Sequence, residues 1–177
     1  MKNLVINLVG GPGCGKSTTM AGVFFYLKKR GYNCEMATEY TKDKVWEEDY
    51  RAMDDQMYII GKQFHRISRL VDKVDIVIMD TSLLSSIIYD KNKSGALRNL
   101  CIEAYNKFNN LVVFIERDNN AAYQEEGRRE DLQQSLAIDE AYIKLLTELN
   151  VPFLKVKNDD SVPFIIEKLK EEGYITD

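Results

Sequence analysis

The sequence has few cysteines, few prolines, one histidine and no long apolar run. Its three cysteines, Cys14, Cys34 and Cys101, lack metal-ligand spacing and are odd in number, so reduced thiols in the cytoplasm are the simplest interpretation. No stretch approaches about 18 apolar residues, so no transmembrane helix is expected. The apolar run at the start of the chain is too short for a secretory signal.

The chain also lacks an excess of positive charge, internal repeats and linker-like stretches. Its net charge of −4 does not favour tight non-specific binding to nucleic acid, although a local basic patch is compatible with it. The 177 residues suit one domain that spans residues 1–177. We therefore expect a single cytoplasmic domain without a membrane partner. Its oligomeric state stays open, with a homodimer as one alternative.

What the sequence does contain is a glycine-rich motif near its beginning. Residues Gly10–Ser17 read G-G-P-G-C-G-K-S, between the apolar run Leu4–Val9 and the helical run Thr18–Arg30. This is the G-x-x-x-x-G-K-[ST] phosphate loop in its proper context, between a strand and a helix. A glycine-rich turn with an incidental lysine is the alternative, and it leaves that context unexplained. The motif predicts a nucleoside triphosphate as the main ligand.

Each residue type in this loop has a physical reason. The glycines lack a Cβ, so the chain can turn tightly and point successive N–H groups inward, and the following helix adds its positive N-terminal end. Lys16 is expected to reach the β- and γ-phosphates, and the Ser17 hydroxyl to hold Mg²⁺. Cys14 lies inside the loop and is interpreted as a spacer rather than as a reactive thiol.

Apolar, strand-like runs alternate with helical ones along the chain. The expected strands are Leu4–Val9, Cys34–Thr38, Asp75–Met79, Leu111–Ile115 and Phe153–Val156. The expected helices are Thr18–Arg30, Asp54–Val71, Ala96–Phe108, Asp131–Asn150 and Val162–Glu172. This alternation predicts an α/β fold, with a parallel sheet covered by helices on both faces. Ligands then bind at the carboxyl ends of the strands, so polar residues that follow the strands are candidate site residues.

Acidic residues follow two of the expected strands. Asp80 ends the third strand, where it could hold Mg²⁺ through water, contact the substrate or cap the next helix. Glu39 follows the second strand, where it could accept a proton from an attacking hydroxyl, bind a ribose or remain a solvated loop residue. Both carboxylates are assigned to the acceptor side of the cleft, and they tilt the interpretation slightly toward a hydroxyl acceptor.

A polar segment at about residues 117–131 follows the fourth strand and is interpreted as a lid. It carries Arg117 at its start and Gly127, Arg128 and Arg129 near its end. Arginines on a closing segment can meet the charge that develops on a transferred phosphoryl group, and closure excludes water. The alternative is a solvated charge cluster, because four acidic residues nearly cancel the arginines.

The helix expected over Asp54–Val71 offers polar side chains to an acceptor. Gln63 and Arg66 lie three residues apart, hence on one helical face, and are candidate substrate-binding residues. A solvent-facing polar stripe is an equally good interpretation. Trp46 and Tyr50 could stack on a base or be buried in the core. His65 is interpreted as a surface or packing residue.

Together the G-G-P-G-C-G-K-S-T loop, Glu39, the strand that ends in D-T-S and the E-R-D…G-R-R segment resemble the nucleoside and nucleotide kinases of the phosphate-loop superfamily. The chain is similar in particular to small bacteriophage-encoded kinases of a branch like the nicotinamide riboside kinases, which would place it in the host cytoplasm. The resemblance implies a five-stranded sheet ordered 2-3-1-4-5, ATP and Mg²⁺. It assigns ATP binding to Gly11, Gly13, Cys14, Gly15, Lys16, Ser17, Thr18, Arg117 and Arg129.

The same resemblance implies the catalytic residues Lys16, Glu39, Asp80 and Arg128, with Ser17 and Asp80 at the metal. The chain departs from deoxynucleoside kinases, because D-T-S stands where those enzymes usually carry an arginine, so the acceptor does not carry over. We expect transfer of the γ-phosphoryl group of ATP to a nucleoside, a nucleotide or a related small molecule. A kinase that acts on DNA and a nucleotide-hydrolysing switch or assembly ATPase are the alternatives.

Overall fold

A five-stranded parallel sheet forms the centre of the computed structural model, which describes residues 3–118, 123–124 and 126–176. The strand order is β2-β3-β1-β4-β5, which confirms the predicted topology. The strands are β1 (Leu4–Val9), β2 (Cys34–Ala37), β3 (Ile76–Met79), β4 (Asn109–Glu116) and β5 (Leu154–Lys157). β4 begins earlier than predicted because Asn109 and Asn110, although polar, pair in register with Leu4 and Val5 of β1.

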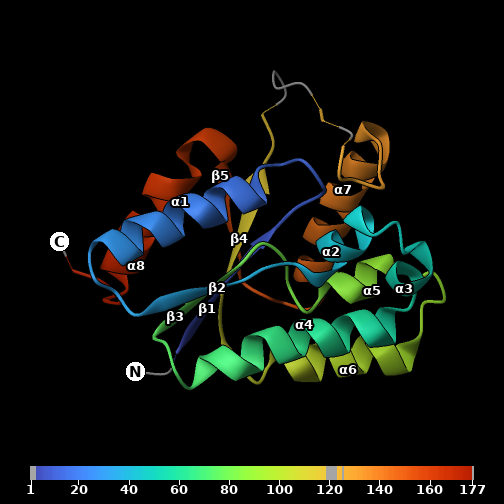
Figure 1. Ribbon diagram of the computed structural model, residues 1–177, viewed down its shortest axis with the longest axis horizontal. Helices are drawn as coiled ribbons and strands as arrows, with labels where there is room; N and C mark the ends of the chain where they lie inside the picture. Colours follow the sequence, from blue (N-terminus) through green and yellow to red (C-terminus); the bar gives the residue numbers. More distant parts are fainter. Residues whose placement is uncertain (1–2, 119–122, 125, 177) are drawn as a thin grey trace.

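Two helical layers enclose the sheet (Figure 1). The side chains of a strand alternate between its faces, and β1 shows this plainly, because Leu4, Ile6 and Leu8 pack into one core while Val5 and Val9 pack into the other. α1 (Lys16–Lys29) and α8 (Ser161–Glu171) cover the first face. α4 (Gln56–Val71), α6 (Gly95–Tyr105) and α7 (Leu132–Glu148) cover the second. Burial on both sides explains why β1 and β3 are wholly apolar or nearly so.

Four short elements of the described chain were not predicted, and all of them lie in connections that follow the carboxyl ends of strands. They are α2 (Tyr40–Trp46), α3 (Tyr50–Asp54), α5 (Ser85–Tyr89) and η1 (Asn158–Asp160). α2 buries none of its residues, so it carries no apolar periodicity that a sequence pattern could reveal. The helix predicted over Asp54–Val71 is divided at Asp55, whose carboxylate caps α4 by accepting a hydrogen bond from the Tyr58 N–H at 3.1 Å.

The connections at residues 38–55 and 80–94 lie above the carboxyl edge of the sheet, and we call them together the platform. The segment that contains α2 and α3 links β2 to α4, and the segment that contains α5 links β3 to α6. α5 contacts α4, α6 and α7, so it lies within the second helical layer. Among the described residues no helix is both long and apolar enough to cross a bilayer.

Candidate active site

The phosphate loop adopts a conformation that its glycines make accessible. Gly10, Gly13 and Gly15 have φ of 138°, 82° and 103°, in the left-handed region where a side chain is strained. Gly15 is the N-cap of α1, and a Cβ on it would lie 1.9 Å from Oδ1 of Asn158. The loop therefore has room only for backbone where β5 and its following turn approach it.

Lys16 and Ser17 occupy the first turn of α1. Lys16 Nζ donates to the carbonyl oxygens of Gly10 and Gly11, at 2.7 and 2.9 Å. The Ser17 hydroxyl donates to Oδ2 of Asp80 at 2.8 Å, and Lys42 Nζ donates to the Ser17 oxygen at 3.1 Å. Serine and aspartate oxygens are the hard ligands that Mg²⁺ accepts beside water and phosphate, so this pair fits the metal that the loop implies.

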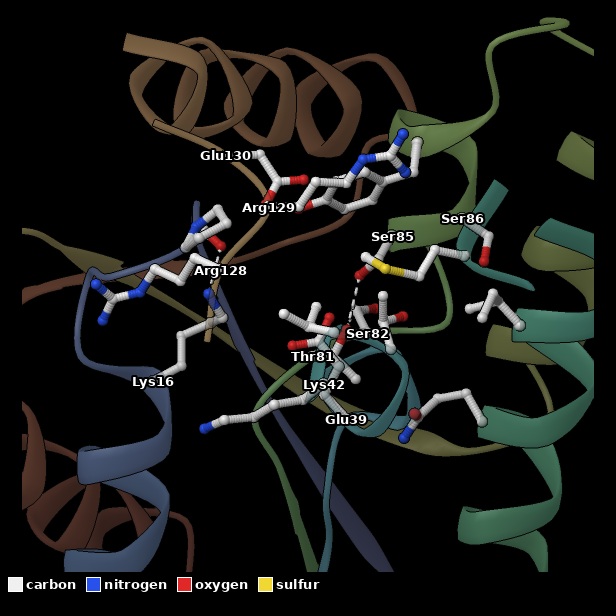
Figure 2. Close-up of a pocket in the computed structure, with 18 of the residues that line it drawn as sticks. Lys16, Glu39, Lys42, Thr81, Ser82, Ser85, Ser86, Arg128, Arg129 and Glu130 are labelled. Atoms are coloured by element: carbon white, nitrogen blue, oxygen red, sulfur yellow. Dashed lines mark hydrogen bonds between the residues drawn. The ribbon is translucent and has the colours of Figure 1, made fainter. Parts of the chain in front are cut away.

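Two carboxylates meet where β2 and β3 end. Asp80 is 2% exposed, and its Oδ1 accepts a hydrogen bond from the Glu39 N–H at 2.8 Å. The Glu39 side chain turns into the pocket (Figure 2). Burial raises the pKa of Glu39 to about 7; the positive charges of Lys16 and Lys42 lower this pKa, and the negative charges of Asp80 and Glu130 raise it. Glu39 is thus a carboxylate that exchanges a proton near neutral pH.

A single pocket of about 510 Å³ extends from the phosphate loop to α4 and α5. Figure 2 shows Lys16 and Arg128 on one side of it and Ser85 and Ser86 on the other. The far part is lined by apolar residues and by hydroxyl and amide groups, which are Val45, Met53, Gln56, Ile59, Ile60, Gln63, Thr81, Ser82, Leu83, Ser85, Ser86, Tyr89 and Tyr142. The pocket therefore has a cationic part over the loop and a part under α4 and α5 that we call uncharged, because the lysine and arginine at its edge, Lys91 and Arg129, are both paired with Asp54.

Hydroxyl groups form a chain along one wall of the uncharged part. The Ser85 hydroxyl lies 3.0 Å from that of Thr81 and 2.6 Å from that of Tyr142. Burial raises the pKa of Tyr89 well above its ordinary value, so this phenol stays neutral and can donate a hydrogen bond. Within the described residues the hydroxyls of Ser86 and Tyr89 make no hydrogen bond, which leaves both for a ligand.

The described part of the lid brings arginines to both parts of the pocket. The Arg128 guanidinium lies over the Tyr123 ring at 4.9 Å and close to Gly13, where a Cβ would come within 3.3 Å of its Cζ. Its Nη1 is buried without a hydrogen-bond partner among the described residues. A buried, unpaired guanidinium N–H is costly, and an anion on the loop would satisfy it. Residues 119–122 and 125 of the predicted lid lie outside the described residues.

The end of the segment predicted to be a lid contacts the platform. Arg129 donates to Oδ1 of Asp54 at 2.7 Å, and Lys91 donates to Oδ2 of the same carboxylate at 2.7 Å. The two cations, Arg129 first, lower the pKa of Asp54 to about 2. A Cβ on Gly127 would lie 2.5 Å from the Trp46 ring, so the lid backbone packs directly on that indole. Trp46 itself is 67% exposed and belongs neither to the core nor to the pocket.

Several candidate residues lie at the pocket wall, and others lie apart from it. The wall includes Gly13, Gly15, Lys16, Ser17, Thr18, Glu39, Gln63, Arg128 and Arg129. Asp80 contacts the pocket only through Ser17 and Glu39. The Gln63 side-chain amide is hydrogen-bonded to the backbone. Its Oε1 accepts from the Tyr40 N–H at 2.8 Å, and its Nε2 donates to the Thr38 carbonyl at 3.3 Å.

Four other candidates do not line the pocket. Arg66 pairs with the Asp43 carboxylate and donates to the Thr38 carbonyl at 3.0 Å, so it braces the loop after β2. Gly11 and Cys14 belong to the phosphate loop itself but are buried and do not line the pocket. Arg117 lies beneath the loop in an ion pair with Asp139, with 8% of its side chain exposed. None of the four lines the described pocket.

Sequence reasoning missed Lys42, Tyr89 and the serines after β3. Lys42 lies on α2, a helix with no detectable pattern, and Tyr89 ends α5, which is five residues long. The D-T-S-L-L-S-S run at residues 80–86 carries a signal in retrospect, because that many small hydroxyl side chains directly after a buried strand favour a polar pocket wall.

The chain was compared with protein families, curated proteins and solved structures. A family model described as an AAA domain matches residues 5–161. No curated protein matches the sequence. Among solved structures, a thymidylate kinase from Ehrlichia chaffeensis superposes with a TM-score of 0.69 at 12% identity, over 96% of this chain and 100% of that one.

A second solved structure, the NadR protein in complex with NR, superposes with a TM-score of 0.73 at 19% identity. The match covers 99% of this chain and 52% of the NadR chain, so the chain spans about half the length of that protein. At these identities the two likenesses show a shared fold. The family model covers most of the sequence, and the chain is therefore a member of the AAA domain family, with the phosphate-loop fold that the two kinase-related structures share.

Proposed function

We propose that the protein is a kinase that transfers the γ-phosphoryl group of ATP to a hydroxyl group of an unphosphorylated, nucleoside-like small molecule. One observation carries the proposal: a single pocket joins an anion-binding loop, with Lys16 and Arg128 beside it, to Glu39, a carboxylate with a pKa of about 7. In-line phosphoryl transfer needs that combination of cations at one end and a proton acceptor at the other.

The donor part of the pocket would bind the triphosphate. Loop amides and the N-terminus of α1 supply partial positive charge, and Lys16 can exchange its two carbonyl partners for phosphate oxygens. Arg128 would place its unpaired Nη1 on the same anion. Ser17, with Asp80 behind it, would hold Mg²⁺, which when bound neutralises charge between the β- and γ-phosphates.

The acceptor part favours an unphosphorylated ligand over a phosphomonoester. Its two nearby cations, Lys91 and Arg129, are both bound to Asp54. Lys42 is directed to Ser17, on the metal side. The remaining wall offers hydroxyls, an amide and apolar side chains, which suit the ring and hydroxyls of a nucleoside. NR is bound by the NadR structure, so a pyridine nucleoside belongs among the acceptors to test.

The experiment is an acceptor screen with γ-labelled ATP and Mg²⁺. Nucleosides, nicotinamide riboside, nucleoside monophosphates and a DNA oligonucleotide are supplied separately, and the labelled product is identified by chromatography. We expect label on a nucleoside-like hydroxyl and little on the monophosphates. Label on monophosphates alone would overturn the choice of an unphosphorylated acceptor.

Two alternatives are separate outcomes of the same screen. Label on the oligonucleotide would identify a DNA kinase, which also requires affinity for DNA that falls steeply with salt. Label released only as free phosphate, whatever the acceptor, would identify a hydrolysing switch. The acidic net charge of −4 counts mildly against the first. The continuous pocket between the loop and the acceptor wall counts against the second, because hydrolysis needs no acceptor space.

A further inference from the structure

Behind the phosphate loop, on the side away from the pocket, three side chains hold its first turn. The Asp139 carboxylate on α7 accepts a hydrogen bond from the Gly11 N–H at 2.5 Å. The Ser135 hydroxyl, one helical turn earlier, donates to the Pro12 carbonyl at 2.5 Å. Packing is tight here, because a Cβ on Gly11 would lie 2.2 Å from the Ser135 carbonyl oxygen. The loop is therefore seated directly on α7.

Arg117, at the end of β4, completes this cluster. Its Nε and Nη2 both donate to Oδ2 of Asp139, at 3.0 and 2.9 Å. Its remaining contacts are a donation from Nη2 to the Ser135 oxygen at 2.7 Å and one from Nη1 to the Pro12 carbonyl at 3.2 Å. The side chains of Arg117 and Asp139 are 8% and 15% exposed, so solvent screens the pair only weakly.

The position of this ion pair has an electrostatic consequence for the loop. A carboxylate bonded to Gly11 stands directly behind the place where a triphosphate would bind, and alone it would repel that anion. Arg117 neutralises the carboxylate without entering the pocket, since it does not line the pocket. The charge pair thus lets Asp139 hold the Gly11 amide while the loop keeps its positive character.

The same helix carries the end of the lid. α7 begins at Leu132, with Asp131 as its N-cap, and Arg128 and Arg129 lie just before it. Ser135 and Asp139 lie in the first and second turns of α7, so the helix that holds the loop also positions the arginine over Gly13. Any displacement of the first turns of α7 from the loop would move Arg128 away from the phosphates.

We propose that Arg117, Asp139 and Ser135 form a clamp that positions the phosphate loop against the lid-bearing end of α7, and that Arg117 supports triphosphate binding indirectly, by neutralising Asp139. This inference rests on the proposed use of ATP but not on the identity of the acceptor. Arg117 and Asp139 are positioning residues, because neither reaches the pocket.

The clamp is tested by calorimetric titration of ATP and ADP with Mg²⁺ and no acceptor, in the full-length protein. We expect Arg117→Ala to weaken ATP binding by about 10-fold or more and ADP binding by less. The Asp139 charge, left without its partner, repels the most highly charged ligand most strongly. Adding Asp139→Asn to Arg117→Ala should restore much of the ATP affinity. Asn keeps an oxygen for the Gly11 N–H and carries no charge.

The control is Glu140→Gln, which removes an exposed acidic side chain from the same helix and should leave both affinities unchanged. Thermal unfolding of each variant shows whether it is folded. Equal weakening of ATP and ADP in folded Arg117→Ala, or no rescue by Asp139→Asn, would overturn the electrostatic role. If the wild-type protein binds ATP but phosphorylates no acceptor, that result would contradict the proposed kinase activity and would not contradict the clamp.

Discussion

At the residue scale, Glu39 connects local environment to chemistry most directly. Its backbone N–H is held by Asp80, so its side chain is directed into the pocket rather than into solvent. Burial, with the nearby charges of Asp80 and Glu130, keeps its pKa at about 7. A carboxylate tuned in this way is a far better proton acceptor near neutral pH than an ordinary glutamate, because its basicity matches the working pH.

The pKa of Glu39 predicts the pH dependence of turnover. Only the deprotonated carboxylate accepts a proton, so the rate with a hydroxyl acceptor should rise with pH and reach half its plateau near pH 7. Glu39→Gln should lower turnover by about 100-fold or more and abolish this rise. Steady-state kinetics from pH 5.5 to pH 9 measure both effects. A wild-type rise retained by Glu39→Gln would assign the ionisation to another group.

The same residue predicts a gain in stability when it is neutralised. The unfolded chain loses the Glu39 proton near pH 4.5 and the folded protein loses it near pH 7, so stability falls as pH rises between these values. Above pH 7, Glu39→Gln should therefore be more stable than the wild type, by on the order of 2 kcal/mol. Urea unfolding at pH 8 and pH 5 measures this, and the difference should shrink at the lower pH.

At the element scale, the lid and the platform are joined by weak, exposed contacts. Arg129 reaches from the lid to Asp54 at the end of α3, and Lys91 reaches the same carboxylate from the turn after α5. Because Asp54 has a pKa of about 2, its charge persists at every pH in which the protein would work. Three segments far apart in sequence therefore meet at one exposed carboxylate.

Loss of this contact is expected to loosen closure rather than to unfold the protein. Asp54→Asn should raise the rate at which ATP is hydrolysed to free phosphate in the absence of an acceptor by about 2- to 5-fold. The effect is small because exposed ion pairs contribute little. A malachite-green phosphate assay measures it. Glu171→Gln, which breaks an exposed ion pair with Lys168 on α8, is the matched control and should change nothing. Unchanged leakage in Asp54→Asn would remove the Arg129–Asp54 pair from lid closure.

At the scale of the whole molecule, the triphosphate would bind where three parts of the fold meet. The loop between β1 and α1, the lid before α7 and the end of β3 all converge on one pocket. A ligand that binds only when these parts are assembled stabilises the folded state as a whole.

Thermal unfolding is therefore expected to report nucleotide binding. Mg²⁺ and ATP at 100 times the dissociation constant should stabilise the fold by about 2.7 kcal/mol and raise Tm by about 5–10 °C for a domain of this size. Lys16→Ala should lose most of this rise, because the lysine carries the main cation of the loop. Lys29→Ala, an exposed lysine in the last turn of α1, should behave like the wild type. No rise with either ATP or GTP would contradict the phosphate-loop assignment.

Local pattern was sufficient for some of this architecture and insufficient for the rest. The loop Gly10–Ser17 is one continuous segment whose glycines and lysine act where they stand, so it could be recognised from sequence. The alternation of strands and helices predicted a parallel sheet, and the resemblance to phosphate-loop kinases implied its strand order, which the sheet confirms. By contrast, Arg66 and Arg117 resemble free cations in the sequence, whereas their partners Asp43 and Asp139 lie 23 and 22 residues away.

The sequence by itself determined the phosphate loop, the parallel sheet and the carboxylates at its edge, because each depends on residues close together in the chain or on simple periodicity. Only the tertiary structure decided which charges face the pocket. Among the described residues Nη1 of Arg128 has no hydrogen-bond partner beside Gly13, Arg117 is neutralised behind the loop, and desolvation raises the pKa of Glu39 to about 7. Burial and pairing between distant segments set these charges, and neither is encoded at any one position.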